Sequence, residues 1–277
     1  MLKPKCSTVL VALLVLCVSV SVAQTSLSTS PLTPGSFAVR DVIHPLAPQQ
    51  ISQSVDSNTL VAGTSVACVG TGGSITTDNH WWRLFDLDDD HALTGALTVE
   101  SVDYGIETST GLQTLTAATY CLDEGLPLLL AFLTLVGVNT VDHPDAELEF
   151  FNIAVGGACD TATQDLAMEM SSEDCLESGT CLQMFIGAND LGQTGPSYLS
   201  AEDCALPDPV DGADFGFPDM HLVYVVNGDA ESGTGDGAGD GNGDGDGVPA
   251  ATGIGMLPMI LVLLGSSAYF LRRRARS

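Results

Sequence analysis

Hydrophobic and polar residues alternate with a period of two through the middle of the chain. The segment NHWWRLFDL, residues 79–87, places Trp81 and Phe85 on one side and Trp82 on the other, which is typical of a strand. Leu97 and Val99 share one phase, and the residues from Val102 onward take the opposite phase, so we expect a long strand with a β-bulge at Ser101–Val102. Further strands are predicted at 112–121, 130–141, 148–155, 166–170, 182–187 and 220–226.

Clusters of Gly, Asn, Asp and Pro separate these strands, and no long segment has a helical period of 3.6. The predicted fold class is therefore all-β, a jelly-roll-like β-sandwich spanning residues 57–227. An uncharged run at 125–141 contains Pro127, Gly137 and Asn139, which make it a poor membrane helix. We interpret it as a loop followed by a buried core strand.

The N-terminal segment has the pattern of an export signal. Two lysines precede an apolar stretch, and Ser21 and Ala23 supply small residues for cleavage before Gln24. Residues 1–23 are thus predicted to be a signal peptide. Residues 24–56 are rich in Ser, Thr, Pro and Gln and are predicted to be an extended spacer.

The C-terminal fifty residues have three parts. A Gly/Asp-rich linker, 228–247, precedes an uncharged segment, 248–271, and a basic tail, 272–277. The uncharged segment would reach about 36 Å as a helix, enough to cross a hydrocarbon core of roughly 30 Å. The arginines Arg272, Arg273, Arg274 and Arg276 place the C-terminus in the cytoplasm before any processing. We therefore expect an exported protein, held in a membrane by its C-terminal helix or displayed at the cell surface.

The net charge of the chain limits the classes of molecule that it can bind. Residues 24–247 contain all 35 acidic residues but only Arg40 and Arg83 as strong bases, a formal charge of −33. Nucleic acids and anionic membrane surfaces would be repelled. The composition fits calcium-rich or saline surroundings, or simply a soluble acidic surface.

Six cysteines remain after signal removal, and an even number in an exported chain indicates three disulfides. Fifteen connectivities are open. Cys175 and Cys181 flank a Gly-containing turn and are paired on that ground. For the others we adopt Cys68–Cys204 and Cys121–Cys159, which spacing alone does not select. Zinc is disfavoured because no C-x-x-C pair is present.

Two acidic clusters are candidate calcium sites, and no other cofactor is expected. Asp86, Asp88 and Asp90 lie in a turn after a predicted strand, where their oxygens could surround one ion. The second cluster, formed by Asp240, Asn242 and Asp244, matches the first half of an EF-type loop. It lacks the acidic twelfth residue, so a solvated tether is the alternative.

Trp81 and Trp82 must face opposite sides of one strand, so at most one joins the main core. The other is either a stacking platform for a glycan or the cover of a second hydrophobic patch under a loop. Enzyme signatures such as G-x-S-x-G and H-E-x-x-H are absent from the sequence. The five scattered histidines are interpreted as loop or surface residues: His44, His80, His91, His143 and His221.

Several segments of the chain resemble a known type of secreted module. Residues 79–87 (NHWWRLFDL), 101–107 (SVDYGIE), 186–204 (IGANDLGQTGPSYLSAEDC) and 216–228 (GFPDMHLVYVVNG) are similar to a β-rich module of bacterial secreted proteins whose function is undefined. The C-terminus resembles the PEP-CTERM and IPTL-CTERM sorting signals, with Val248 and Pro249 at the motif position. This resemblance implies a sorting protease or transpeptidase as a partner.

The sequence thus predicts an exported, surface-displayed, non-catalytic protein with a role in adhesion, matrix or envelope structure. The alternative is a carbohydrate-binding accessory domain, or a hydrolase whose site is built from loops and escapes motif search.

Overall fold

The computed structural model describes residues 25–40, 49–73, 75–179 and 181–230. The chain divides into two units between Thr234 and Gly235, and every described residue belongs to the first unit. The predicted signal peptide, apolar segment and basic tail lie outside the described residues, as does the Gly/Asp linker except for residues 228–230. Within the described ranges, no helix is long and apolar enough to span a membrane.

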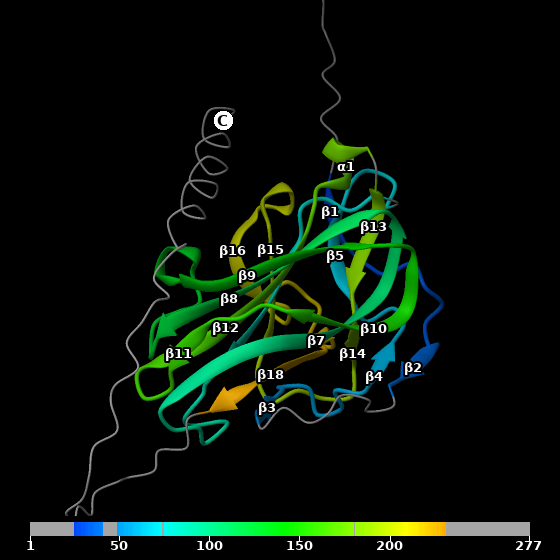
Figure 1. Cartoon of the computed structure of the whole chain (residues 1–277). Coiled ribbons are helices and arrows are strands. Elements are labelled where there is room, and N and C mark those ends of the chain that lie inside the picture. The colour runs from blue at the N-terminus through cyan, green and yellow to red at the C-terminus, as the bar shows by residue number, and fades with distance from the viewer. Residues whose placement is uncertain (1–24, 41–48, 74, 180, 231–277) are drawn as a thin grey trace, which may run out of the picture. The chain divides into compact units, whose positions relative to one another are not determined.

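The described chain is all-β and contains two six-stranded sheets (Figure 1). Sheet I has the order β16-β15-β6-β12-β8-β9, and each strand is antiparallel to its neighbours. Its strands are β6 (His80–Phe85), β8 (Gln113–Asp123), β9 (Thr134–His143), β12 (Gln164–Ser172), β15 (Ser197–Ala201) and β16 (Leu206–Asp211).

Sheet II is built on one long strand, β7 (Ala96–Gly111), in the order β10-β7-β18-β3. Two shorter strands, β11 and β13, also pair with β7 near its two ends. The remaining strands are β3 (Gln49–Ile51), β10 (Ala146–Ala154), β11 (Ala158–Asp160), β13 (Cys181–Ile186) and β18 (Tyr224–Ala230). The predicted bulge in β7 is present but lies one residue earlier, at Glu100. Val99 and Ser101 pair with consecutive residues of β18, so Glu100 has no register partner in that strand.

Three two-stranded pairs complete the fold. They are β1 (Ser26–Thr29) with β5 (Val66–Val69), β2 (Phe37–Val39) with β4 (Thr59–Val61), and β14 (Ala188–Asn189) with β17 (His221–Leu222). The spacer predicted at 24–56 is therefore wrong for its described part, which contributes β1, β2 and β3. Backbone pairing with later strands orders this Ser/Thr-rich segment, and composition does not register such pairing. The C-terminal boundary moves from 227 to Ala230, where β18 ends.

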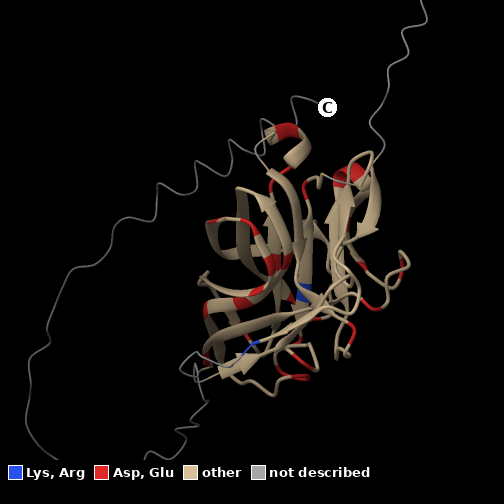
Figure 2. Ribbon diagram, turned by 90° about the vertical axis from the view of Figure 1, so that its right-hand side faces the viewer, with Lys and Arg blue, Asp and Glu red and all other residues tan. Residues whose placement is uncertain are grey.

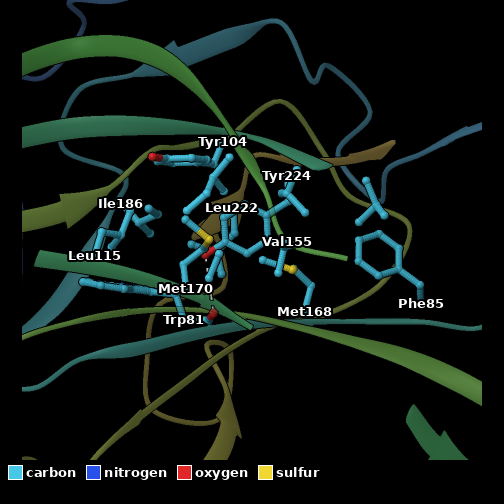
Figure 3. Close-up of a cluster of buried hydrophobic side chains, with 14 of the residues drawn as sticks. Trp81, Phe85, Tyr104, Leu115, Val155, Met168, Met170, Ile186, Leu222 and Tyr224 are labelled. Carbon is cyan, nitrogen blue, oxygen red and sulfur yellow. Dashed lines mark hydrogen bonds between the residues drawn. The ribbon is translucent and has the colours of Figure 1, made fainter. Parts of the chain in front are cut away.

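One hydrophobic core lies between the two sheets (Figure 3). Sheet I contributes the inward residues of β6 and β12, such as Trp81, Phe85 and Met170. Sheet II contributes residues of β7 and β18, such as Tyr104 and Tyr224, and the Tyr224 hydroxyl donates to the carbonyl oxygen of Trp81 at 3.4 Å. The inward positions are those that the period-two alternation assigns to one face.

The prediction for residues 125–141 is half correct. The first part is a loop with a short 3-10 turn, η1 (Leu130–Phe132), and the second part is strand β9. The strand is not a core strand, however, because it is the last strand of sheet I and most of its residues are exposed. Only Val136 and Val141 pack against the main core.

Three disulfides tie the fold together, and they are the three pairs adopted from the sequence. Cys68–Cys204 joins β5 to the turn η2 (Glu202–Cys204), and Cys121–Cys159 joins β8 to β11. Cys175–Cys181 closes a single helical turn, α1 (Cys175–Ser178), onto β13. This turn is capped by Asp174 at its start and by Gly179, with φ of 65°, at its end.

Candidate functional site

The outer face of sheet I, turned away from the main core, carries a second hydrophobic cluster. Trp82 of β6 packs there with Leu122 and Ala167, and Leu128 and Leu133 of the loop before β9 lie over them. Trp82 is only 1% exposed, and its Nε1 donates to Ser200 Oγ at 3.0 Å. The loop therefore covers the face that the strand would otherwise offer to solvent.

Neither tryptophan is exposed enough in this conformation to stack on a glycan. Trp81 is fully buried in the main core, where its Nε1 donates to the carbonyl oxygen of Val66 at 2.7 Å. Trp82 instead covers a hydrophobic patch under a loop, which is the alternative role predicted from the sequence. Because both rings are buried, neither presents a flat face to a sugar.

A polar cluster that the hydrophobic pattern does not predict lies beside Trp82 on the same face. Glu169 of β12 is 5% exposed and accepts from the Tyr120 hydroxyl at 2.6 Å. Its other oxygen contacts Nδ1 of His80. The His80 ring stacks on Trp82 with centroids 6.4 Å apart, and burial with the nearby Glu169 raises the pKa of Tyr120.

The three residues come from three adjacent strands, β6, β12 and β8, and each points away from the main core. Alternation predicts that His80 shares the phase of Trp82. That Glu169 lies beside Trp82 follows from the register of β12 against β6, which the sequence does not give. A histidine oriented by a carboxylate is an arrangement that acid–base catalysis uses. It is equally a means of satisfying a buried carboxylate with two donors.

The acidic turn after β6 brings three carboxylates together. Carboxylate oxygens of Asp86, Asp88 and Asp89 lie within 4.8 Å of one another, so Asp89 takes the place assigned to Asp90. The physical reason is local, because the Asp89 amide donates to Asp86 Oδ1 at 2.9 Å and to Asp88 Oδ1 at 2.8 Å, which folds the turn tightly. Three carboxylates fit a hard cation, although calcium takes six to eight oxygens and water would supply the rest.

A fourth carboxylate, that of Asp165 at the start of β12, belongs to the same acidic end of the sheet. Burial raises the pKa of Asp165 to about 6, and repulsion from Asp86, Glu124, Asp88 and Asp90 adds to this effect. The repulsion shows that acidic groups crowd this end without a compensating cation among the described side chains. The second predicted cluster, Asp240, Asn242 and Asp244, lies outside the described residues.

The described part of the chain contains two arginines, Arg40 and Arg83, among many acidic residues (Figure 2). Arg40 pairs with Asp103 at 3.0 Å and lies over the Phe150 ring. Arg83 is 1% exposed and donates only to neutral oxygens, those of Gln193, Gly195, Ser54 and Leu222. Burial lowers the pKa of Arg83 to about 9.

Two of the histidines interpreted as loop or surface residues are buried instead. His143 is 2% exposed, contacts the Tyr104 hydroxyl through Nε2 and packs edge-on against Phe151. His221 is also buried, and its Nδ1 accepts from the Gly192 amide at 3.0 Å. Burial lowers the pKa of both histidines. His143 ends β9 and His221 begins β17, so their burial follows from the pairing and packing of these strands. His44 lies outside the described residues.

Comparisons with known proteins add little to this geometry. No family model and no curated protein matches the chain. Among solved structures, one match is to a clostridial cysteine protease, Cwp84, after propeptide cleavage, with 14% sequence identity and a TM-score of 0.38. The match covers 62% of this chain and 43% of that protein, and at this level of similarity it supports no conclusion about activity.

Proposed function

We propose that this chain is an exported, surface-displayed, non-catalytic β-sandwich of the jelly-roll kind, with a role in adhesion, matrix or envelope structure. The observation that carries the proposal is that its rare chemically capable side chains serve the fold. Arg83 and His143 are buried and bonded within it, and Glu107, also buried, accepts from the backbone amides of Gly63 and Ser65. Groups fixed in this way hold loops together and do not face a substrate.

Export and display are supported by the disulfides and by the two ends of the sequence. Three bridges in one domain are typical of an oxidising compartment. The signal-like N-terminus and the apolar segment 248–271 with its arginines would carry the domain across a membrane and retain it there.

Processing near Val248 and Pro249 by a sorting protease or transpeptidase is part of the proposal. Epitope tags on either side of Val248, followed in the native host, test it. Separation of the tags onto two species supports processing, and both tags on one membrane-bound species means a permanent anchor. Replacing Arg272, Arg273, Arg274 and Arg276 with Ser should impair retention in either case.

The alternative, a glycan-binding module or a hydrolase, is favoured by one observation, the cluster of His80, Glu169 and Tyr120 beside Trp82. A glycan array and a hydrolysis screen on the wild-type protein and on Glu169→Gln decide between the two functions. Glu177→Gln is a matched control, because Glu177 is exposed on α1. The non-catalytic proposal expects no signal in either screen. A signal lost in Glu169→Gln and kept in Glu177→Gln would establish the alternative.

A further inference from the structure

A buried carboxylate lies at the acidic end of sheet I, at the start of β12. It belongs to Asp165, which is only 8% exposed. Among the described residues, none donates a hydrogen bond to this carboxylate or forms an ion pair with it. A carboxylate that is largely removed from water normally has such a partner, because an isolated buried charge is costly. The Asp165 side chain therefore points to a positively charged ligand from outside the chain.

Strand register places Asp165 beside Asp86 on the outer face of sheet I. Leu166 of β12 pairs with Phe85 of β6, and both residues belong to the main core. The residues that come next on the two antiparallel strands are Asp165 and Asp86, and alternation turns both side chains to the outer face. Among charged groups, Asp86 repels Asp165 most strongly. The two carboxylates are therefore neighbours at the end of the β6–β12 ladder.

The turn after β6 brings two more carboxylates to the same place. Oxygens of Asp86, Asp88 and Asp89 lie within 4.8 Å of one another. Asp88 also repels Asp165, so the turn lies close to the start of β12. Four carboxylates thus meet at this end of the sheet, three from one turn and one from a strand that is distant in sequence.

Within the described part of the chain, the cationic side chains are engaged elsewhere. Arg40 pairs with Asp103, and Arg83 is buried among neutral oxygens. His91 lies in the same loop as the acidic turn, but its ring packs beside Phe85, and burial lowers its pKa, so it is neutral at pH 7. A cation from solution is the direct means of offsetting the charge of the four carboxylates.

We propose that these four carboxylates bind one calcium ion, which joins the turn after β6 to β12. They are those of Asp86, Asp88, Asp89 and Asp165. Carboxylate oxygens suit a hard cation, and calcium takes six to eight of them in flexible geometry, with water completing the shell. Magnesium needs a near-ideal octahedron and usually keeps its water, so it is bound by one or two carboxylates and fits this site less well.

The site is open to solvent on one side, because Asp89 is exposed, and is closed on the other by the buried Asp165. We therefore expect a dissociation constant of about 10⁻⁴ to 10⁻³ M, as in extracellular calcium modules. Bound calcium removes the repulsion among the four groups and stabilises the folded state by mass action.

Thermal melting of the full-length chain in detergent, with calcium titrated at matched ionic strength, tests the proposal. At about ten times the dissociation constant, calcium should raise the melting temperature of the wild type by about 3 to 6 °C relative to EDTA. Asp165→Asn should melt above the wild type in EDTA, because it removes repulsion, yet a tenfold weaker site would leave it a calcium increment of only about 1 °C. Asp214→Asn, an exposed position after β16, should keep the full increment.

The higher melting temperature of Asp165→Asn in EDTA shows that this variant folds, so its lost calcium response reports on the site itself. Equal calcium increments in the wild type and Asp165→Asn, or no increment in the wild type, would overturn the proposal. A magnesium increment as large as that of calcium would also overturn it, since it would indicate diffuse screening by divalent ions. So would a lower melting temperature of Asp165→Asn in EDTA, because the carboxylate would then be stabilising without the ion. None of these outcomes depends on where the protein is displayed, so this proposal is tested separately from the proposed function.

Discussion

The guanidinium Nε of Arg83 lies 3.1 Å from the carbonyl oxygen of Leu222, although 139 residues separate them. The same guanidinium donates to Gln193 Oε1 and to the carbonyl oxygen of Gly195, both at 2.8 Å. One buried cation thus connects β6 to the loop at 190–196 and to β17. Its partners are all neutral oxygens, so its role here is to hold these segments in place.

Replacing Arg83 with Met should therefore destabilise the domain by about 3 kcal/mol or more, because several buried acceptors lose their donor at once. Urea unfolding measures the loss. Gln193→Ala removes only one of the partners and should cost about 1 kcal/mol. Equal stability of Arg83→Met and the wild type would contradict this role for Arg83.

The disulfides should differ in their contribution to stability. Cys68–Cys204 closes a sequence separation of 136 and Cys175–Cys181 one of 6. In the loop-entropy account, the longer bridge restricts the unfolded chain more, by about 2–3 kcal/mol. Chemical unfolding of Cys68→Ala/Cys204→Ala and of Cys175→Ala/Cys181→Ala tests this order. A larger loss from the short bridge would show that native contacts, and not chain entropy, dominate.

Asp165 should make stability depend on pH between about 4 and 6. Its pKa is raised to about 6 in the folded protein from 3.8, so the folded state holds a proton that the unfolded state has released. The contribution of Asp165 is fully present below pH 3.8 and is lost as the pH rises through about 6. Asp165→Asn should flatten this part of the melting-temperature profile and raise the melting temperature at pH 7. Glu177→Gln, on α1 and not among the groups that repel Asp165, should leave the profile unchanged.

Added salt should raise the melting temperature, because residues 24–247 carry a formal charge of −33 and repel one another. Calcium should raise it further if the turn of Asp86, Asp88 and Asp89 binds the ion. Asp88→Asn/Asp89→Asn should remove the calcium increment and keep the sodium chloride increment. Identical melting in EDTA and in calcium at matched ionic strength would eliminate the calcium site.

The strands were predictable where burial on one face imposed a strict alternation. β6, β8 and β12 fall at or near their expected positions, because their inward residues form the core. β1, β2 and β3 were missed because Ser and Thr carry little hydrophobic signal, and pairing with β5, β4 and β18 orders them. The uncharged β9 was expected inside because absence of charge resembles burial in a sequence.

The polar cluster on sheet I was harder to predict than the strands. His80 and Glu169 are 89 residues apart, and only the register of β12 against β6 brings them together. Alternation assigns each residue to the outer face of its strand but does not say which strands are neighbours. The acidic turn, in contrast, is local, so the sequence located it to within one residue.

We propose that this domain is displayed outside the cell as a disulfide-bridged protein. Protease treatment of intact cells of the native host, followed by unreduced mass spectrometry of the released fragments, tests it most directly. The expected result is that intact cells lose the domain to the protease and that its fragments carry the bridges Cys68–Cys204, Cys121–Cys159 and Cys175–Cys181. A domain that is protected in intact cells and digested only after lysis, or that carries free thiols, would contradict it.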